Sequence, residues 1–130
     1  IFLDTPPAWN FYTRSALIPS ERCLLPFDCH AFSRQALYTL LQQVREISSD
    51  HNPQLEVDGI VANQFQPRAR LPRQLLEEML AEDLPVLETK LSSSIKIRES
   101  HQHCKPLVFM DPQHKMTLEF RNLYHELQSN

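Results

Sequence analysis

The chain has 130 residues, of which 42% are hydrophobic and 22% are charged, a composition typical of a folded globular domain and not of a disordered segment. Its net charge of −3 excludes a general polycation, although a local basic patch is still compatible with it. The only glycine is Gly59, which excludes a glycine-rich phosphate loop within the chain, and the three cysteines show no spacing typical of a disulfide framework.

The first half of the chain alternates between strand-like and helix-like patterns. Ile1–Leu3 is a short apolar run that ends at Asp4, as a buried parallel strand would. Because a buried strand is an unusual place for a natural chain to begin, we expect this chain to be the later part of a larger protein. The apolar run at 23–27 predicts a second strand. From Ser33 to Ile47 apolar residues recur at helical spacing, with Ser33 as the expected N-cap.

The second half repeats this alternation. Residues 55–63 predict a strand that becomes fully buried toward its end, and residues 85–91 predict a further strand. Between them, Pro72 marks the first turn of a helix whose apolar stripe is Leu75, Leu76, Met79 and Leu80. Asp111-Pro112 is expected to cap the last helix, whose buried face should consist of Met116, Phe120, Leu123, Tyr124 and Leu127.

This alternation predicts an α/β fold, with a mostly parallel sheet and helices on both faces. No repeat or linker divides the chain, so we expect residues 1–130 to form a single domain. Open parallel sheets bind their ligands beyond the carboxyl ends of the strands. Candidate functional residues are therefore those that follow each strand: Asp4–Pro7, Asp28–His30, Asn63–Arg70 and the residues from Ser92 onward.

Four motifs at these strand ends resemble the ParA partition ATPases, which belong to the ParA/MinD branch of P-loop proteins with a deviant Walker A motif. In chain order they are Asp-Thr-Pro-Pro at 4–7, Leu-Leu-Pro-Phe-Asp-Cys at 24–29, Gly-Ile-Val-Ala-Asn-Gln-Phe at 59–65 and Ile-Lys-Ile-Arg-Glu-Ser-His at 95–101. The chain departs from the usual family sequence at Ala8-Trp9-Asn10, at Ser92-Ser93-Ser94 and at Gln102-His103-Cys104. These departures indicate a divergent subgroup.

The resemblance implies a homodimeric ATPase with a P-loop fold that binds ATP and Mg²⁺ and, as the ATP-bound dimer, non-specific DNA. It also implies a ParB-like centromere-binding partner, a role in moving plasmid or chromosome cargo, and a cytoplasmic, nucleoid-associated location. The Walker A loop and the catalytic aspartate of the family would lie upstream of Ile1. We therefore expect no catalytic residue in this chain and no ATPase activity from it alone.

Two positions are expected to contact the nucleotide. Asp4, at a strand tip, would hold Mg²⁺ through water, with Thr5 and Pro6 shaping the loop beside it. The alternative for Asp4 is that it caps the turn after it. Asn63 would contact the adenine base, because an amide both donates and accepts hydrogen bonds, and its alternative is a role in the turn after the strand.

The expected DNA-binding residues are Arg68, Arg70, Lys96 and Arg98, on two loops that an α/β sheet could bring together. The alternative is a solvated charged face, because a run of acidic residues (Glu77, Glu78, Glu82 and Asp83) follows the first pair. His101, His103 and Cys104 have a spacing that fits no common structural zinc site.

Two other functions are compatible with the sequence. One is a scaffold or regulatory protein that has lost hydrolysis on the same fold, and the other is a MinD-like positioning ATPase. The last residues, Leu127–Asn130, lack the basic amphipathic helix that membrane targeting needs, so we expect no membrane contact.

Overall fold

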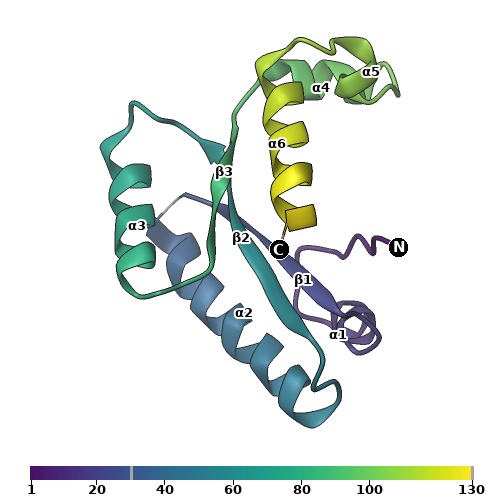
Figure 1. Cartoon of the computed structure of the whole chain (residues 1–130), viewed down its shortest axis with the longest axis vertical. Helices are drawn as coiled ribbons and strands as arrows, with labels where there is room; N and C mark the ends of the chain where they lie inside the picture. Colours follow the sequence, from purple (N-terminus) through teal and green to yellow (C-terminus); the bar gives the residue numbers. More distant parts are fainter. Residues whose placement is uncertain (30, 130) are drawn as a thin grey trace.

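The computed structural model describes residues 1–29 and 31–129 of the chain. Strands β1 (Arg22–Asp28), β2 (Glu56–Phe65) and β3 (Val86–Ser92) form one parallel sheet in the order β1-β2-β3 (Figure 1). The described helices are α1 (Phe11–Leu17), α2 (Ala31–Asp50), α3 (Arg70–Ala81), α4 (Ile95–Gln102), α5 (Leu107–Met110) and α6 (Lys115–Ser129). The α/β fold with a parallel sheet is confirmed.

Helices α2 and α3 cover one face of the sheet. Alternate residues of β1 and β2 point to this face, where Phe27 and Ile60 are at most 2% exposed. The helices supply Leu37 and Leu41 from α2 and Leu76 and Met79 from α3. Burying each of these side chains contributes about 1.5–3 kcal/mol, so this layer is the main source of stability.

Helix α6 covers the opposite face, over β2 and β3. Val61, Leu87 and Leu91 of the sheet pack there against Leu123 of α6. Gly59 of β2 lies on this face, and a Cβ atom at that position would come within 2.4 Å of the Leu87 side chain. The missing side chain therefore lets Leu87 lean across β2, and the expected helices on both faces are confirmed.

The strand expected at Ile1–Leu3 is wrong. Residues 1–6 have no regular secondary structure, and Ile1 and Phe2 are almost fully exposed. A strand of three residues forms too few ladder hydrogen bonds to offset the entropy lost when its backbone is ordered. Asp4 is therefore not at the tip of a strand in this structure.

Several helix details also differ from expectation. Ser33 lies inside α2 and is not its N-cap, because the helix begins at Ala31. Phe120 and Tyr124 were expected to be buried but are exposed, since α6 turns only its Leu123 side toward the sheet. Leu80 of α3 is also exposed. The short helices α1, α4 and α5 were not predicted.

Candidate functional site

The carboxyl ends of β1 and β2 bring Asp28 and Asn63 together. These residues are register partners, and Asn63 Nδ2 donates a hydrogen bond to Asp28 Oδ1 over 2.9 Å. Both side chains are half-buried. The bond uses one of the two N–H groups of the amide and fixes the orientation of the side chain. Asn63 thus has the rigid, partly exposed position that contact with a ligand requires.

Lys90 of β3 belongs to the same edge. Its Nζ lies 5.9 Å from the centre of the Phe65 ring, at the end of β2. Burial raises the pKa of the Cys29 thiol; the negative charge of Asp28 raises it further, and the positive charge of Lys90 partly opposes both effects. The Cys29 thiol thus interacts electrostatically with both Asp28 and Lys90, which lie around the same end of the sheet.

The carboxyl end of β3 is held by α6. Glu119 accepts hydrogen bonds from the N–H group of Ser92 over 2.8 Å and from its Oγ–H over 2.7 Å. Lys115 Nζ donates to Ser92 Oγ over 2.8 Å and lies 3.4 Å from the Glu119 carboxylate. The sequence pointed to the region after Ser92 but not to Glu119, because the contact joins residues from two elements.

The expected partners Asp4, Thr5 and Pro6 are not brought to this edge. They are exposed and precede α1, which packs against the last turns of α2 near the amino ends of the strands. In Figure 1 the N-terminus lies well away from the carboxyl end of β2. The two halves of the expected nucleotide site, Asp4–Pro6 and Asn63, are therefore separate in this structure.

The described residues contain no cluster of protein ligands for a metal ion. Within residues 1–29 and 31–129 no group of three or more His, Cys, Asp or Glu side chains is close enough to hold an ion.

The four basic residues were expected on two loops, but three of them lie in helices. Arg68 is in the turn after β2 and Arg70 is the first residue of α3, whereas Lys96 and Arg98 are on α4. All four are exposed and follow carboxyl ends of strands, so both pairs lie on one side of the sheet. Lys96 Nζ donates to Glu99 over 2.8 Å, and this hydrogen bond raises the pKa of Lys96.

Acidic residues near the first basic pair are occupied elsewhere. Arg34 of α2 forms ion pairs with Glu78 of α3 and with Glu82, the residue that follows α3, and Tyr38 donates a hydrogen bond to Glu82. These contacts join α2 to α3 and partly neutralise the acidic run. The exposed arginines at 68 and 70 therefore face less acidic competition than the sequence suggests.

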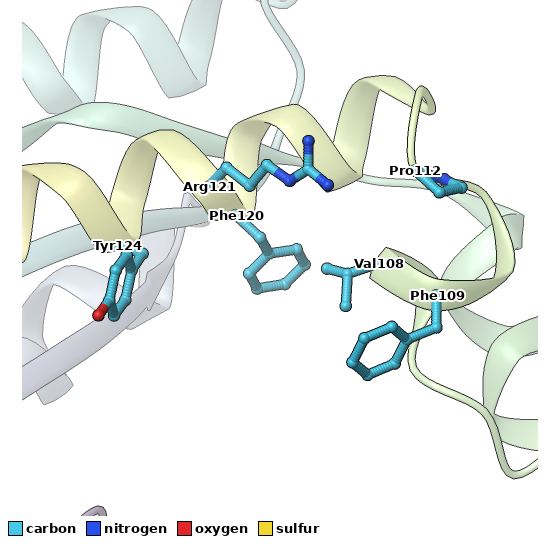
Figure 2. Close-up of a pocket in the computed structure, with 6 residues that line it drawn as sticks. All are labelled: Val108, Phe109, Pro112, Phe120, Arg121 and Tyr124. Carbon is cyan, nitrogen blue, oxygen red and sulfur yellow. The ribbon is translucent and has the colours of Figure 1, made fainter.

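An open apolar groove of about 590 Å³ lies between α5 and α6. Figure 2 shows Val108, Phe109 and Phe120 pointing into the same space, with Arg121 along its rim. Tyr124 and Pro112 complete the lining. The sequence assigned Phe120 and Tyr124 to the core, so the groove was missed.

No helix among the described residues has the length and apolar character needed to cross a bilayer.

Comparison with known proteins gives a consistent set of matches. The family model described as "AAA domain" matches residues 1–57. The sporulation initiation inhibitor protein Soj of Bacillus subtilis is 26% identical over 131 residues, which cover 100% of this chain and 52% of Soj. The chromosome partitioning protein ParA of Myxococcus xanthus is 26% identical over 98% of this chain and 45% of its own length. The chromosome-partitioning ATPase Soj of Treponema pallidum is 24% identical over 98% of this chain and 51% of its own length.

The fold is shared with a solved structure. Cobyrinic acid a,c-diamide synthase from Mycobacterium smegmatis superposes with a TM-score of 0.58 at 20% identity, over 81% of this chain and 45% of that protein. At this identity the likeness shows the fold alone. The chain spans about half the length of the curated relatives that it matches.

Proposed function

We propose that the chain forms the carboxyl-terminal part of a ParA-like ATPase that partitions plasmids or chromosomes. The observation that carries the proposal is the match over 98–100% of the chain to several chromosome-partitioning proteins. The intact protein would bind ATP and Mg²⁺, dimerise, and act in the cytoplasm on the nucleoid with a ParB-like partner.

Asn63 is the proposed base-contacting residue. Its hydrogen bond to Asp28 supports this role because it holds the amide at the carboxyl edge, where open parallel sheets receive ligands. A metal role for Asp4, with Thr5 and Pro6 beside it, requires residues 1–3 to join the sheet. They do not do so in this structure.

Arg68, Arg70, Lys96 and Arg98 are the proposed contacts to DNA phosphates. Their exposure and their common position on the carboxyl side of the sheet support this role. Exposed arginine and lysine side chains neutralise phosphates without reading the sequence of bases, as non-specific DNA binding requires.

We also propose that residues 1–130 are one unit of a larger domain. Leu24 and Pro26 of β1 are exposed, and the described strands leave the outer edge of β1 unpaired. An unpaired edge with exposed apolar side chains supports a neighbour supplied by further sequence.

The test begins with the sequence encoded upstream of Ile1. A Lys-Gly-Gly-x-Gly-Lys-[Ser/Thr] loop there supports the ATPase, and its absence overturns the proposal. The protein with that segment should bind duplex DNA in an ATP-dependent and salt-sensitive way. Arg68→Ala and Lys96→Ala should each weaken binding and lower the salt slope by about one, whereas Arg45→Ala on the exposed side of α2 should not.

The second candidate is a non-hydrolysing scaffold or regulator on the same fold. It is compatible with the single glycine, which excludes a phosphate loop within the 130 residues under either function. Steady-state hydrolysis distinguishes the two functions: the chain alone should show no turnover, and a protein extended upstream should hydrolyse ATP only in the first case.

A further inference from the structure

Residues 93–114 form a lobe that leaves and rejoins the body of the protein at two neighbouring points. We call it the basic lobe after its three cationic residues, Lys96, Arg98 and Lys105, which outnumber Glu99 and Asp111. The lobe contains α4 and α5, begins after Ser92 at the end of β3, and ends before Lys115 at the start of α6. In Figure 1 it extends beyond the end of the sheet. It carries Lys96 and Arg98, two of the proposed DNA contacts.

A single carboxylate, that of Glu119, contacts the two residues that flank this lobe, Ser92 and Lys115, which we call its roots. Glu119 accepts two hydrogen bonds from Ser92, from its N–H over 2.8 Å and its Oγ–H over 2.7 Å. Lys115, the other root, donates to the same Ser92 Oγ over 2.8 Å and lies 3.4 Å from Glu119. The three side chains satisfy one another, because the hydroxyl donates to the carboxylate and accepts from the ammonium.

The position of Glu119 makes these contacts stronger than ordinary surface pairs. Its side chain is only 15% exposed, whereas that of Lys115 is 66% exposed. Hydrogen bonds to a partly buried carboxylate are short and are weakly screened by solvent. The connection between the lobe and the sheet is therefore held by the partly buried Glu119, while the Lys115 side chain remains largely in solvent.

The same contact reaches the ligand edge of the sheet. Ser92 is the register partner of Phe65, which lies two residues after Asn63. A shift of Ser92 would therefore move the end of β2, next to the pair formed by Asn63 and Asp28. This connection runs through backbone pairing and not through a long chain of side chains.

A second glutamate of α6 provides a matched comparison. Glu126 accepts from the backbone N–H groups of Glu88 over 2.7 Å and Thr89 over 2.9 Å. It holds the middle of β3 by the same chemistry and from the same helix. It does not contact either root of the lobe.

We propose that Glu119 is a positioning residue that fixes the basic lobe against the carboxyl edge of the sheet, so that nucleotide at that edge and DNA on the lobe affect each other's binding. The functional part of this statement rests on the proposed function. The structural part, that Glu119 sets the orientation of the lobe, stands on the contacts of Ser92 and Lys115 alone.

The test measures the distance between the lobe and the sheet in the 130-residue protein. Cys104 is exposed in the lobe, whereas burial raises the pKa of Cys23 to about 11 and also raises that of Cys29, so a spin label attaches selectively at Cys104. A second label is placed through Arg45→Cys on α2. Glu119→Gln should broaden the distribution of distances between the labels, and Glu126→Gln should leave it narrow.

Hydrogen exchange gives the second readout. Glu119→Gln should raise exchange in residues 92–102 about tenfold while exchange at Ile60–Ala62 stays unchanged. Ser92→Ala, which removes only the hydroxyl, should give a smaller rise and serves if Glu119→Gln does not fold. Equal distance distributions in the two glutamine variants, or exchange that rises equally over the whole chain, would overturn the proposal.

These measurements use neither nucleotide nor DNA, so the positioning role and the proposed function fail separately. In the protein extended upstream, charge alone predicts that Glu119→Gln and Glu126→Gln both tighten DNA binding. Lobe positioning predicts that Glu119→Gln instead weakens it, and a change of equal sign and size in both variants contradicts the coupling.

Discussion

The two edges of the sheet are built differently. At the β3 edge, Glu119 and Glu126 of α6 accept hydrogen bonds from backbone N–H groups and close the edge. At the β1 edge, the described residues provide no neighbouring strand, and Leu24 is 37% exposed. The difference shows that backbone N–H groups of β3 are satisfied by α6, whereas the outer edge of β1 has no such partner among the described residues.

The largest effect is expected on the β3 side of the sheet, where α6 covers the strand. Leu87→Ala removes a buried side chain that packs under α6, and should lower the free energy of unfolding by about 2–5 kcal/mol. Leu24→Ala, on the open side, should change it by less than about 0.5 kcal/mol. Urea unfolding of both variants gives the comparison, and equal losses would contradict it.

A smaller effect is expected at Gly59, which separates the two sides. Gly59→Ala places a methyl group against Leu87 and should cost about 1–3 kcal/mol by overpacking. In the double variant with Leu87→Ala the new methyl group gains room, so the two losses should not add. Strictly additive losses in a double-mutant cycle would show that the contact with Leu87 is not the cause.

The closed edge should also depend on pH. Burial disfavours the charged form of Glu126, but hydrogen bonds from Thr89 and Glu88 outweigh this and lower its pKa below the ordinary 4.5. A depressed carboxyl pKa stabilises the fold at higher pH, and this contribution is lost as pH falls from about 4.5 through the folded-state pKa. Glu126→Gln should reduce the loss of unfolding free energy on acidification by an amount on the order of 1 kcal/mol. Glu46→Gln, at an exposed position on α2, should leave this loss unchanged.

The smallest change in stability is expected at the open edge. Pro26 lacks an N–H group, and its exposed position on an edge strand limits pairing with another chain. Pro26→Val should alter the free energy of unfolding by less than about 0.5 kcal/mol but increase concentration-dependent self-association. Sedimentation of wild type and variant over a range of concentrations checks this, and identical profiles would show that Pro26 does not protect the edge.

The sequence predicted the three strands of the sheet because each contains a short cluster of apolar residues between polar or helix-like segments, although β3 also includes Glu88, Thr89 and Lys90. It failed at Ile1–Leu3, where the run is just as apolar but is not paired with the sheet. It also missed α4 and α5, since short helices depend on caps such as Ser94, whose hydroxyl accepts from Lys96 N–H over 3.2 Å, more than on periodicity.

For the site, the sequence found Asn63 from its place after a buried strand. It could not find the partnership with Asp28, because that depends on the register between β1 and β2. The role of Glu119 was hidden for a similar reason, since Ser92, which donates two hydrogen bonds to it, lies on another element 27 positions earlier in the chain. Such contacts follow from tertiary structure and leave no local pattern.

The closing of β3 by α6 has a consequence for synthesis of the chain on the ribosome. Strands β1 and β2 and helices α2 and α3 can pack as soon as residue 81 has emerged, because every buried member of their shared core precedes it and only the partly buried Leu84 and Val86 follow. Strand β3 keeps its backbone N–H groups and Leu87 uncovered until Glu126 has been made. The nascent protein thus exposes the unpaired edge of β3, in addition to that of β1, while about 35 further residues are added. This takes roughly 2–7 s at 5–20 residues per second.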